Sequence, residues 1–133
     1  MTTATKGNIK FTRKTIFVSV TKALKGEVDD VLSTTPLKDV ARGYWEVGRK
    51  ASQCELLAAV ENGVVIGVWE IDRSKGWTPS QRRSIKTRGP IIPDPNRKYC
   101  EVTTAQPNCP INGKPVSSIV DVWRMYGPIR YNF

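Results

Sequence analysis

The fold of this chain is decided by the stretch Leu56-Leu57-Ala58-Ala59-Val60-Glu61-Asn62-Gly63-Val64-Val65-Ile66-Gly67-Val68-Trp69-Glu70-Ile71. Asn-Gly readily adopts the positive φ angles of a tight turn, so the two apolar runs predict an antiparallel hairpin of residues 56–60 and 64–71. The second run is almost continuously apolar, which predicts an interior strand covered on both faces. Gly67 indicates a bulge or a close approach to the backbone.

Shorter elements are expected on both sides of this hairpin. Residue type and alternation predict further strands at 15–20, 99–105 and 129–133. Helical spacing of apolar residues predicts helices within 24–32, from Pro36 to Gly43, and from Pro115 to Gly127. Because strands do not alternate regularly with long helices, we expect an α+β fold with a small, strongly curved sheet and peripheral helices.

The basic region after the hairpin is the strongest functional signal. Glycines and prolines interrupt the pattern from Asp72 to Asn96, which predicts a long loop. The stretch from Arg73 to Lys98 holds eight basic residues against Asp94 alone, and so carries seven of the nine net positive charges. A solvated surface is the plainer interpretation. Basic residues around an aromatic residue such as Trp77, however, suit nucleic acid.

Length and charge limit the class of protein. The chain has 133 residues and a net charge of +9, which predicts one domain over 1–133, a loose tail at 1–10, and anionic partners. The sequence has no apolar run of about 18 residues and no secretory signal. We therefore expect nucleic acid and not a membrane as the partner, and a cytoplasmic location.

Catalytic and metal chemistry receives little support from the residue types. Histidine is absent, which removes the commonest general base and most metal sites. The three cysteines are too widely spaced for paired zinc ligands. Glu70 and Asp72 would share one side of a strand and could hold Mg²⁺, but solvated or ion-paired acids at a strand end are favoured. We assign no catalytic residue, no metal site and no cofactor.

Aromatic and basic residues around the hairpin are the candidate nucleic-acid-binding residues. A tryptophan ordinarily fills a core, and for Trp69 a core and a pocket are equally expected. For Trp45 and Trp77, each near a glycine and close to basic residues, stacking on bases is favoured. The full set is Tyr44, Trp45, Trp69, Arg73, Lys75, Trp77, Arg82, Arg83, Lys86 and Arg88, of which the last four are the strongest candidates for phosphate contact.

A family resemblance accompanies these residues. Arg42-Gly43-Tyr44-Trp45-Glu46-Val47, followed by the hairpin, resembles part of the PUA-like superfamily, and more narrowly the EVE-type and YTH-like domains of bacterial and phage defence proteins. Asn112-Gly113-Lys114-Pro115-Val116 and Gly127-Pro128-Ile129-Arg130-Tyr131 are similar to the end of such domains. The resemblance implies a small PUA-like β-barrel with helices at its rim, and a pocket that holds a flipped, often modified, base.

On matching positions the resemblance implies that Tyr44 and Trp45 line the pocket, with Gly67 and Trp69 near its mouth. Residues 73–98 do not align with the family, and Trp77 is our candidate for the second aromatic pocket residue.

Three classes of function stay open. The first is a non-enzymatic nucleic-acid-binding module, for DNA or RNA, that reads a modified base in the aromatic pocket and holds the phosphate backbone with the basic loop. The second is a nucleic-acid- or nucleotide-processing enzyme of the ASCH type, with Lys50, Glu70, Asp72 and Lys75 as its candidate residues. The third is a protein-interaction factor in phage defence, or a domain fused to an effector, whose basic loop docks on an acidic protein.

Overall fold

The computed structural model describes residues 11–25, 36–43, 45, 47–82, 92–119 and 129–133, and at 22–23, 80–82 and 92–97 it describes the backbone alone. Its elements are β1 (Thr15–Ser19), α1 (Thr21–Leu24), α2 (Leu37–Arg42), the 3₁₀ helix η1 (Arg49–Gln53), β2 (Leu56–Glu61), β3 (Val64–Ile71), β4 (Trp77–Arg82), β5 (Ile92–Cys100), β6 (Val102–Ala105), the 3₁₀ helix η2 (Val116–Ser118) and β7 (Ile129–Tyr131). The tail predicted at 1–10 lies outside the described residues.

The predicted hairpin is confirmed and forms the middle of a five-stranded sheet. The strand order is β6-β3-β2-β1-β7; β1 and β2 run parallel and the other neighbours are antiparallel. Asn62 and Gly63 have φ angles of 50° and 83°, as the tight turn requires. The predicted strands at 15–20 and 129–133 are also confirmed, as β1 and β7.

The predicted β-barrel is wrong. In the described part of the chain the sheet remains open, with β6 and β7 at its two edges. Both edge strands are short, at four and three residues, and β4 and β5 form a second sheet of their own instead of joining the first. Closure requires edge strands that pair along their length, and these do not pair with each other. The β-barrel that the family resemblance implied is therefore wrong as well.

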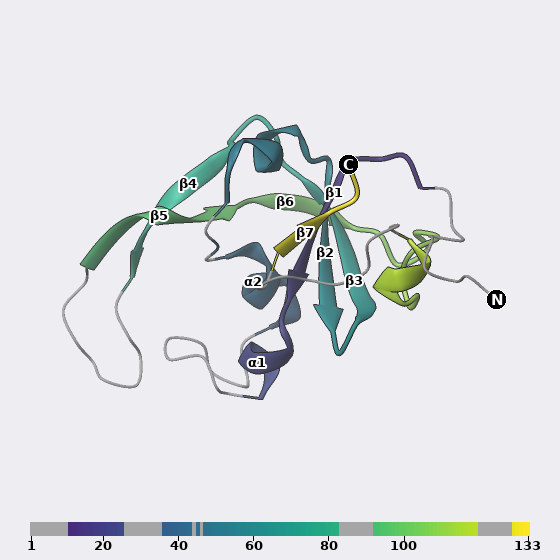
Figure 1. The fold of residues 1–133 in the computed structure, drawn as a ribbon. Helices are drawn as coiled ribbons and strands as arrows, with labels where there is room; N and C mark the ends of the chain where they lie inside the picture. The colour runs from purple at the N-terminus through teal and green to yellow at the C-terminus, as the bar shows by residue number, and fades with distance from the viewer. Residues whose placement is uncertain (1–10, 26–35, 44, 46, 83–91, 120–128) are drawn as a thin grey trace.

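The predicted long basic loop is wrong over two of its segments. β4 and β5 pair antiparallel from Trp77 with Cys100 to Arg82 with Ile92, forming a two-stranded ribbon that extends away from the main sheet (Figure 1). Pro79, Pro93 and Pro95 lie within these strands. Proline lacks an N–H group but is tolerated on edge strands, and both strands of a two-stranded sheet are edges. The signals that predicted a loop therefore also suit a ribbon.

The predicted α+β fold, a strongly curved sheet with peripheral helices, is wrong, because the described residues form a mostly-sheet domain in which only part of the predicted helices is present. The helix after Pro36 is confirmed as α2, whereas α1 ends at Leu24, where the predicted segment 24–32 begins. The described beginning of the predicted C-terminal helix is the single 3₁₀ turn η2, and residues 120–128, with Trp123, lie outside the described residues. No helix among the described residues is long and apolar enough to cross a membrane.

Hydrophobic residues cover both faces of the sheet. The first core joins the face carrying Ile16, Val18, Leu57 and Trp69 to α2 and to Cys100 at the base of the ribbon. The second core joins the opposite face, with Phe17, to the segment 109–119. β3 contributes to both cores and pairs with a strand on each side, so the prediction of an interior strand is confirmed.

Candidate nucleic-acid interface

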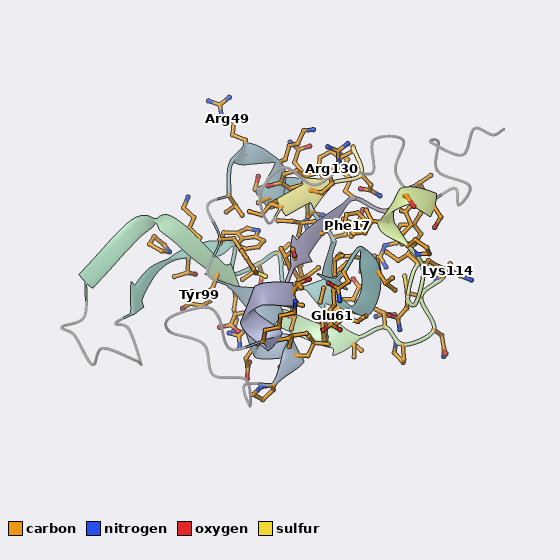
Figure 2. The ribbon with its side chains drawn as sticks, turned by 60° about the horizontal axis from the view of Figure 1, so that its bottom comes forward. Phe17, Arg49, Glu61, Tyr99, Lys114 and Arg130 are labelled. Carbon is orange, nitrogen blue, oxygen red and sulfur yellow. The ribbon has the colours of Figure 1, made fainter. Side chains whose placement is uncertain are left out.

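Basic residues gather at one end of the main sheet. β1 and β2 begin there and β3 and β7 finish there, because Leu56 pairs with both Thr15 and Glu70, and Ile16 pairs with Tyr131. We call this region the basic end; its cations are Arg13, Lys14, Arg49, Lys50, Arg73 and Lys75, all exposed. Figure 2 shows Arg49 projecting from the molecule, with Lys114 on a different side.

Most cations of the basic end are not neutralised by neighbouring acids. Arg13 pairs with Glu55 and Glu70, and Arg42 pairs with Asp39 and Glu101. These are four of the six acidic side chains that the structure describes. Within the described residues, Lys14, Arg49, Lys50, Arg73 and Lys75 form no ion pair. Exposed cations that have no ion-pair partner on the protein attract anionic ligands.

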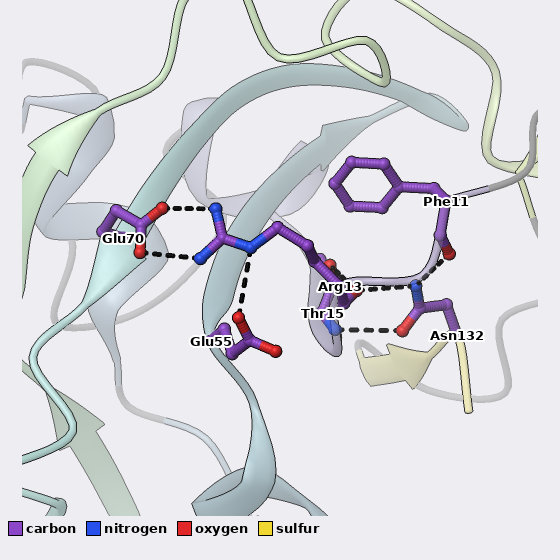
Figure 3. Close-up of polar contacts among 6 residues, drawn as sticks. All are labelled: Phe11, Arg13, Thr15, Glu55, Glu70 and Asn132. Atoms are coloured by element: carbon purple, nitrogen blue, oxygen red, sulfur yellow. Dashed lines mark hydrogen bonds and ion pairs between the residues drawn. The ribbon is translucent and has the colours of Figure 1, made fainter.

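Arg13 binds Glu70, one of the two acids that the enzyme hypothesis needed. Its guanidinium donates to both carboxylate oxygens of Glu70, at 2.6 and 2.9 Å, and to Glu55 Oε1 at 3.1 Å (Figure 3). The hydrogen bonds from Arg13 lower the pKa of Glu70. Asp72 accepts hydrogen bonds from the N–H and hydroxyl groups of Ser74. In the part of the chain described, no group of three Cys, Asp or Glu residues could hold a metal ion.

Asn132 joins β7 to the segment that precedes β1. Its Oδ1 accepts the N–H of the buried Thr15 at 2.9 Å, and its Nδ2 donates to the carbonyl oxygens of Phe11 and Arg13 (Figure 3). Arg13 then reaches across to Glu70 on β3. Two polar side chains thus fix the relative position of three strands at the basic end.

The three described candidate tryptophans all contact the first core. Trp69 is 8 % exposed and belongs to it, and Trp45 and Trp77 are half-buried against it. The indole N–H of Trp45 donates to Ala41 O at 2.8 Å, and that of Trp77 donates to Ala51 O at 3.1 Å. Each fulfils the core role ordinarily expected of a tryptophan. A base-reading role for these residues stays a prediction.

An aromatic–lysine cluster, consisting of Lys14, Lys50, Tyr131 and Phe133, lies at the basic end. The ammonium groups of Lys14 and Lys50 are 5.2 and 5.3 Å from the centre of the Phe133 ring, and Lys50 is also 5.8 Å from that of Tyr131. The two rings meet edge to face, 5.8 Å apart at 71°. Lysines over aromatic faces at these distances are held by cation–π attraction.

The buried thiol of Cys54 lies beneath this surface. Burial raises its pKa to about 12, while the positive charges of Arg73, Lys14 and Lys50 oppose that increase. All three cations therefore act on the same thiol, although they come from three separate segments. Burial likewise raises the pKa of Cys100 to about 12, so both thiols are protonated core residues at neutral pH, as expected for small buried cysteines.

The structure places part of the predicted site at the basic end. Arg73 and Lys75 lie in the exposed turn between β3 and β4. Tyr44, Arg83, Lys86 and Arg88 lie outside the described residues, and Arg82 ends β4 with its side chain undescribed. Sequence reasoning did not select Lys14, Arg49, Tyr131 and Phe133, which the structure places at the basic end, and proposed Lys50 only for catalysis. The alternation at 129–133 predicted a strand there but gave no sign of a site.

A scan of the chain against protein-family models, and searches of curated proteins and of solved structures, found no match.

Proposed function

We propose that this protein is a nucleic-acid-binding module whose basic end and ribbon contact the phosphate backbone. The observation that carries the proposal is the continuity of the two basic regions. Trp77, at the base of the ribbon, donates to Ala51 O in η1, the same short helix that carries Arg49 and Lys50. The charged stretch from Arg73 to Lys98 begins at the basic end with Arg73 and Lys75, and the ribbon that continues it starts at Trp77 beside η1.

Phosphate contact has a characteristic dependence on salt. Each neutralised phosphate releases counterions, so the logarithm of the affinity falls linearly with the logarithm of the salt concentration. Such contacts give affinity without much sequence information. The reading of a modified base by Trp45, Trp69 and Trp77 would add selectivity, but the proposal does not depend on it.

The test compares two doubly substituted proteins of equal net charge. Arg49→Gln with Arg73→Gln removes two cations of the basic end, and Lys25→Gln with Lys114→Gln removes two exposed cations elsewhere. Binding of labelled DNA and RNA oligonucleotides is measured by fluorescence anisotropy at several salt concentrations. We expect the first variant to bind at least about tenfold more weakly and with a shallower salt slope, because it loses up to two phosphate contacts.

The control variant is expected to retain nearly wild-type affinity. Equal losses in both variants would show that only net charge matters, and binding by the wild type that is absent or insensitive to salt would reject the function.

A further inference from the structure

Phe133 is the exposed large apolar residue of the described chain. Its side chain is 37 % exposed, and it lies beside Tyr131 on the chain segment that forms and follows β7. Lys14 and Lys50 approach this one ring from the start of β1 and from η1. Three segments distant in sequence thus converge on a solvent-accessible aromatic ring.

The two lysines keep donors for an anion. Lys14 Nζ donates to Gln53 Oε1 at 3.3 Å, and Lys50 Nζ donates to the main-chain oxygen of Phe133. A lysine ammonium has three donors, so each of the two retains unused ones. Their ammonium groups lie 5.2 and 5.3 Å from the centre of the Phe133 ring, so both carry these unused donors beside the same ring. The carboxylates of Glu55 and Glu70 are bound by Arg13, and neither lysine forms an ion pair with a described side chain, so an external anion can supply a counter-charge.

Groups suited to a phosphate and a surface suited to a base lie together in this cluster. Phosphate oxygens can accept donors from these lysines, while the exposed part of the Phe133 side chain offers an apolar surface to a planar base. Bases within a duplex are stacked on one another, whereas unpaired bases are free to stack on protein aromatic side chains.

We propose that the aromatic–lysine cluster binds an unpaired nucleotide of a single strand, with its base against Phe133 and its phosphate at Lys14 and Lys50. The inference rests on the proposed function and narrows its ligand to single-stranded nucleic acid.

The experiment uses three probes on the full chain: an oligothymidylate strand, an abasic strand of the same length, and a duplex. Phe133→Ala is expected to weaken oligothymidylate binding about tenfold and to leave abasic binding unchanged, because only the stacked base is lost. Phe133→Trp is expected to retain or strengthen binding. Lys14→Gln with Lys50→Gln is expected to weaken binding of both single strands. Lys114→Gln is the charge control, and circular dichroism checks that each variant folds.

The outcomes separate this inference from the proposed function. Equal loss of oligothymidylate and abasic binding in Phe133→Ala would overturn base stacking, as would tighter binding of the duplex than of the single strand. If Phe133→Ala binds normally while Arg49→Gln with Arg73→Gln remains weak, the inference fails and the function stands. If the wild type binds none of the probes, the proposed function is rejected, and the inference that rests on it is rejected too.

Discussion

At the scale of single residues, Arg13 makes the strongest polar contacts of the basic end. Exposed ion pairs ordinarily contribute little to stability, because solvent screens them and side-chain entropy opposes them. Arg13 differs in geometry, since its planar guanidinium binds both oxygens of Glu70 and a further oxygen of Glu55. It fixes the segment before β1 against the end of β3, and leaves the surrounding lysines without carboxylate partners.

We predict that Glu70→Gln destabilises the fold by about 1 kcal/mol or less at neutral pH. The pKa of Glu70 is lowered in the folded state, so its ionised form stabilises the fold above the unfolded pKa near 4.5. This contribution disappears as the pH falls through the folded pKa. Urea unfolding of wild type and variant should therefore differ at pH 7 and converge in acid. Glu61→Gln, at the other end of the hairpin, is the control; a difference that does not change with pH would contradict the prediction.

At the scale of elements, Gly67 marks a break in the pairing of β3 with β2. The pairing of β2 with β3 shifts between Ala59 and Val60, so the bulge suggested by Gly67 is confirmed. A Cβ atom at Gly67 would lie 2.6 Å from Cη2 of Trp69, which shows that the indole lies across the glycine. The close approach expected of this glycine is therefore made by the neighbouring tryptophan of the same strand.

We predict that Gly67→Ala lowers the free energy of unfolding by about 1–3 kcal/mol, the usual cost of forcing extra atoms into a packed site. Trp69 is buried in the first core, so its ring has little room to move away. Gly48→Ala is the matched control, because a Cβ there meets no atom within 4 Å and its φ angle of −104° suits alanine. Urea denaturation measures both variants, and equal stability of the two would refute this account.

The distance in sequence between paired residues decided which elements could be predicted. The β2–β3 hairpin is local, because Asn62-Gly63 specifies its turn, and the sequence predicted it correctly. The β4–β5 ribbon pairs residues that are separated by the undescribed segment 83–91, and its prolines favour a loop just as strongly. The open sheet depends on the shortness of β6 and β7, which no local pattern specifies.

At the scale of the whole molecule, the order and direction of the strands bring the residues of the candidate site together. The parallel pairing of β1 with β2 brings Lys14 beside the segment that carries Lys50, and the antiparallel β7 returns Phe133 to the same end. Net charge alone predicts an anionic ligand, but the cluster joins three segments that only the assembled sheet brings together. For the same reason sequence reasoning selected Arg73 and Lys75, which lie in one charged run, and did not select Phe133.

Asn132 links the stability of the sheet edge to this site, since β7 pairs with β1 alone over three residues. Asn132→Ala would leave the N–H of Thr15 without its acceptor, at a cost of about 1–3 kcal/mol for a buried donor. We predict that hydrogen exchange increases most in residues 11–16 and 129–133, and less in β2 and β3, because an edge strand opens locally.

The same variant should bind oligothymidylate more weakly although it loses no charge, because Tyr131 and Phe133 depend on β7 for their position. Asn112→Ala, which removes a side-chain hydrogen bond to Pro107 O on the segment beside the second core, is the control and should leave binding unchanged. Uniformly faster exchange with wild-type binding would show that Asn132 supports only global stability. Faster exchange at the edge together with weaker binding would show that the pairing of β7 positions the aromatic–lysine cluster.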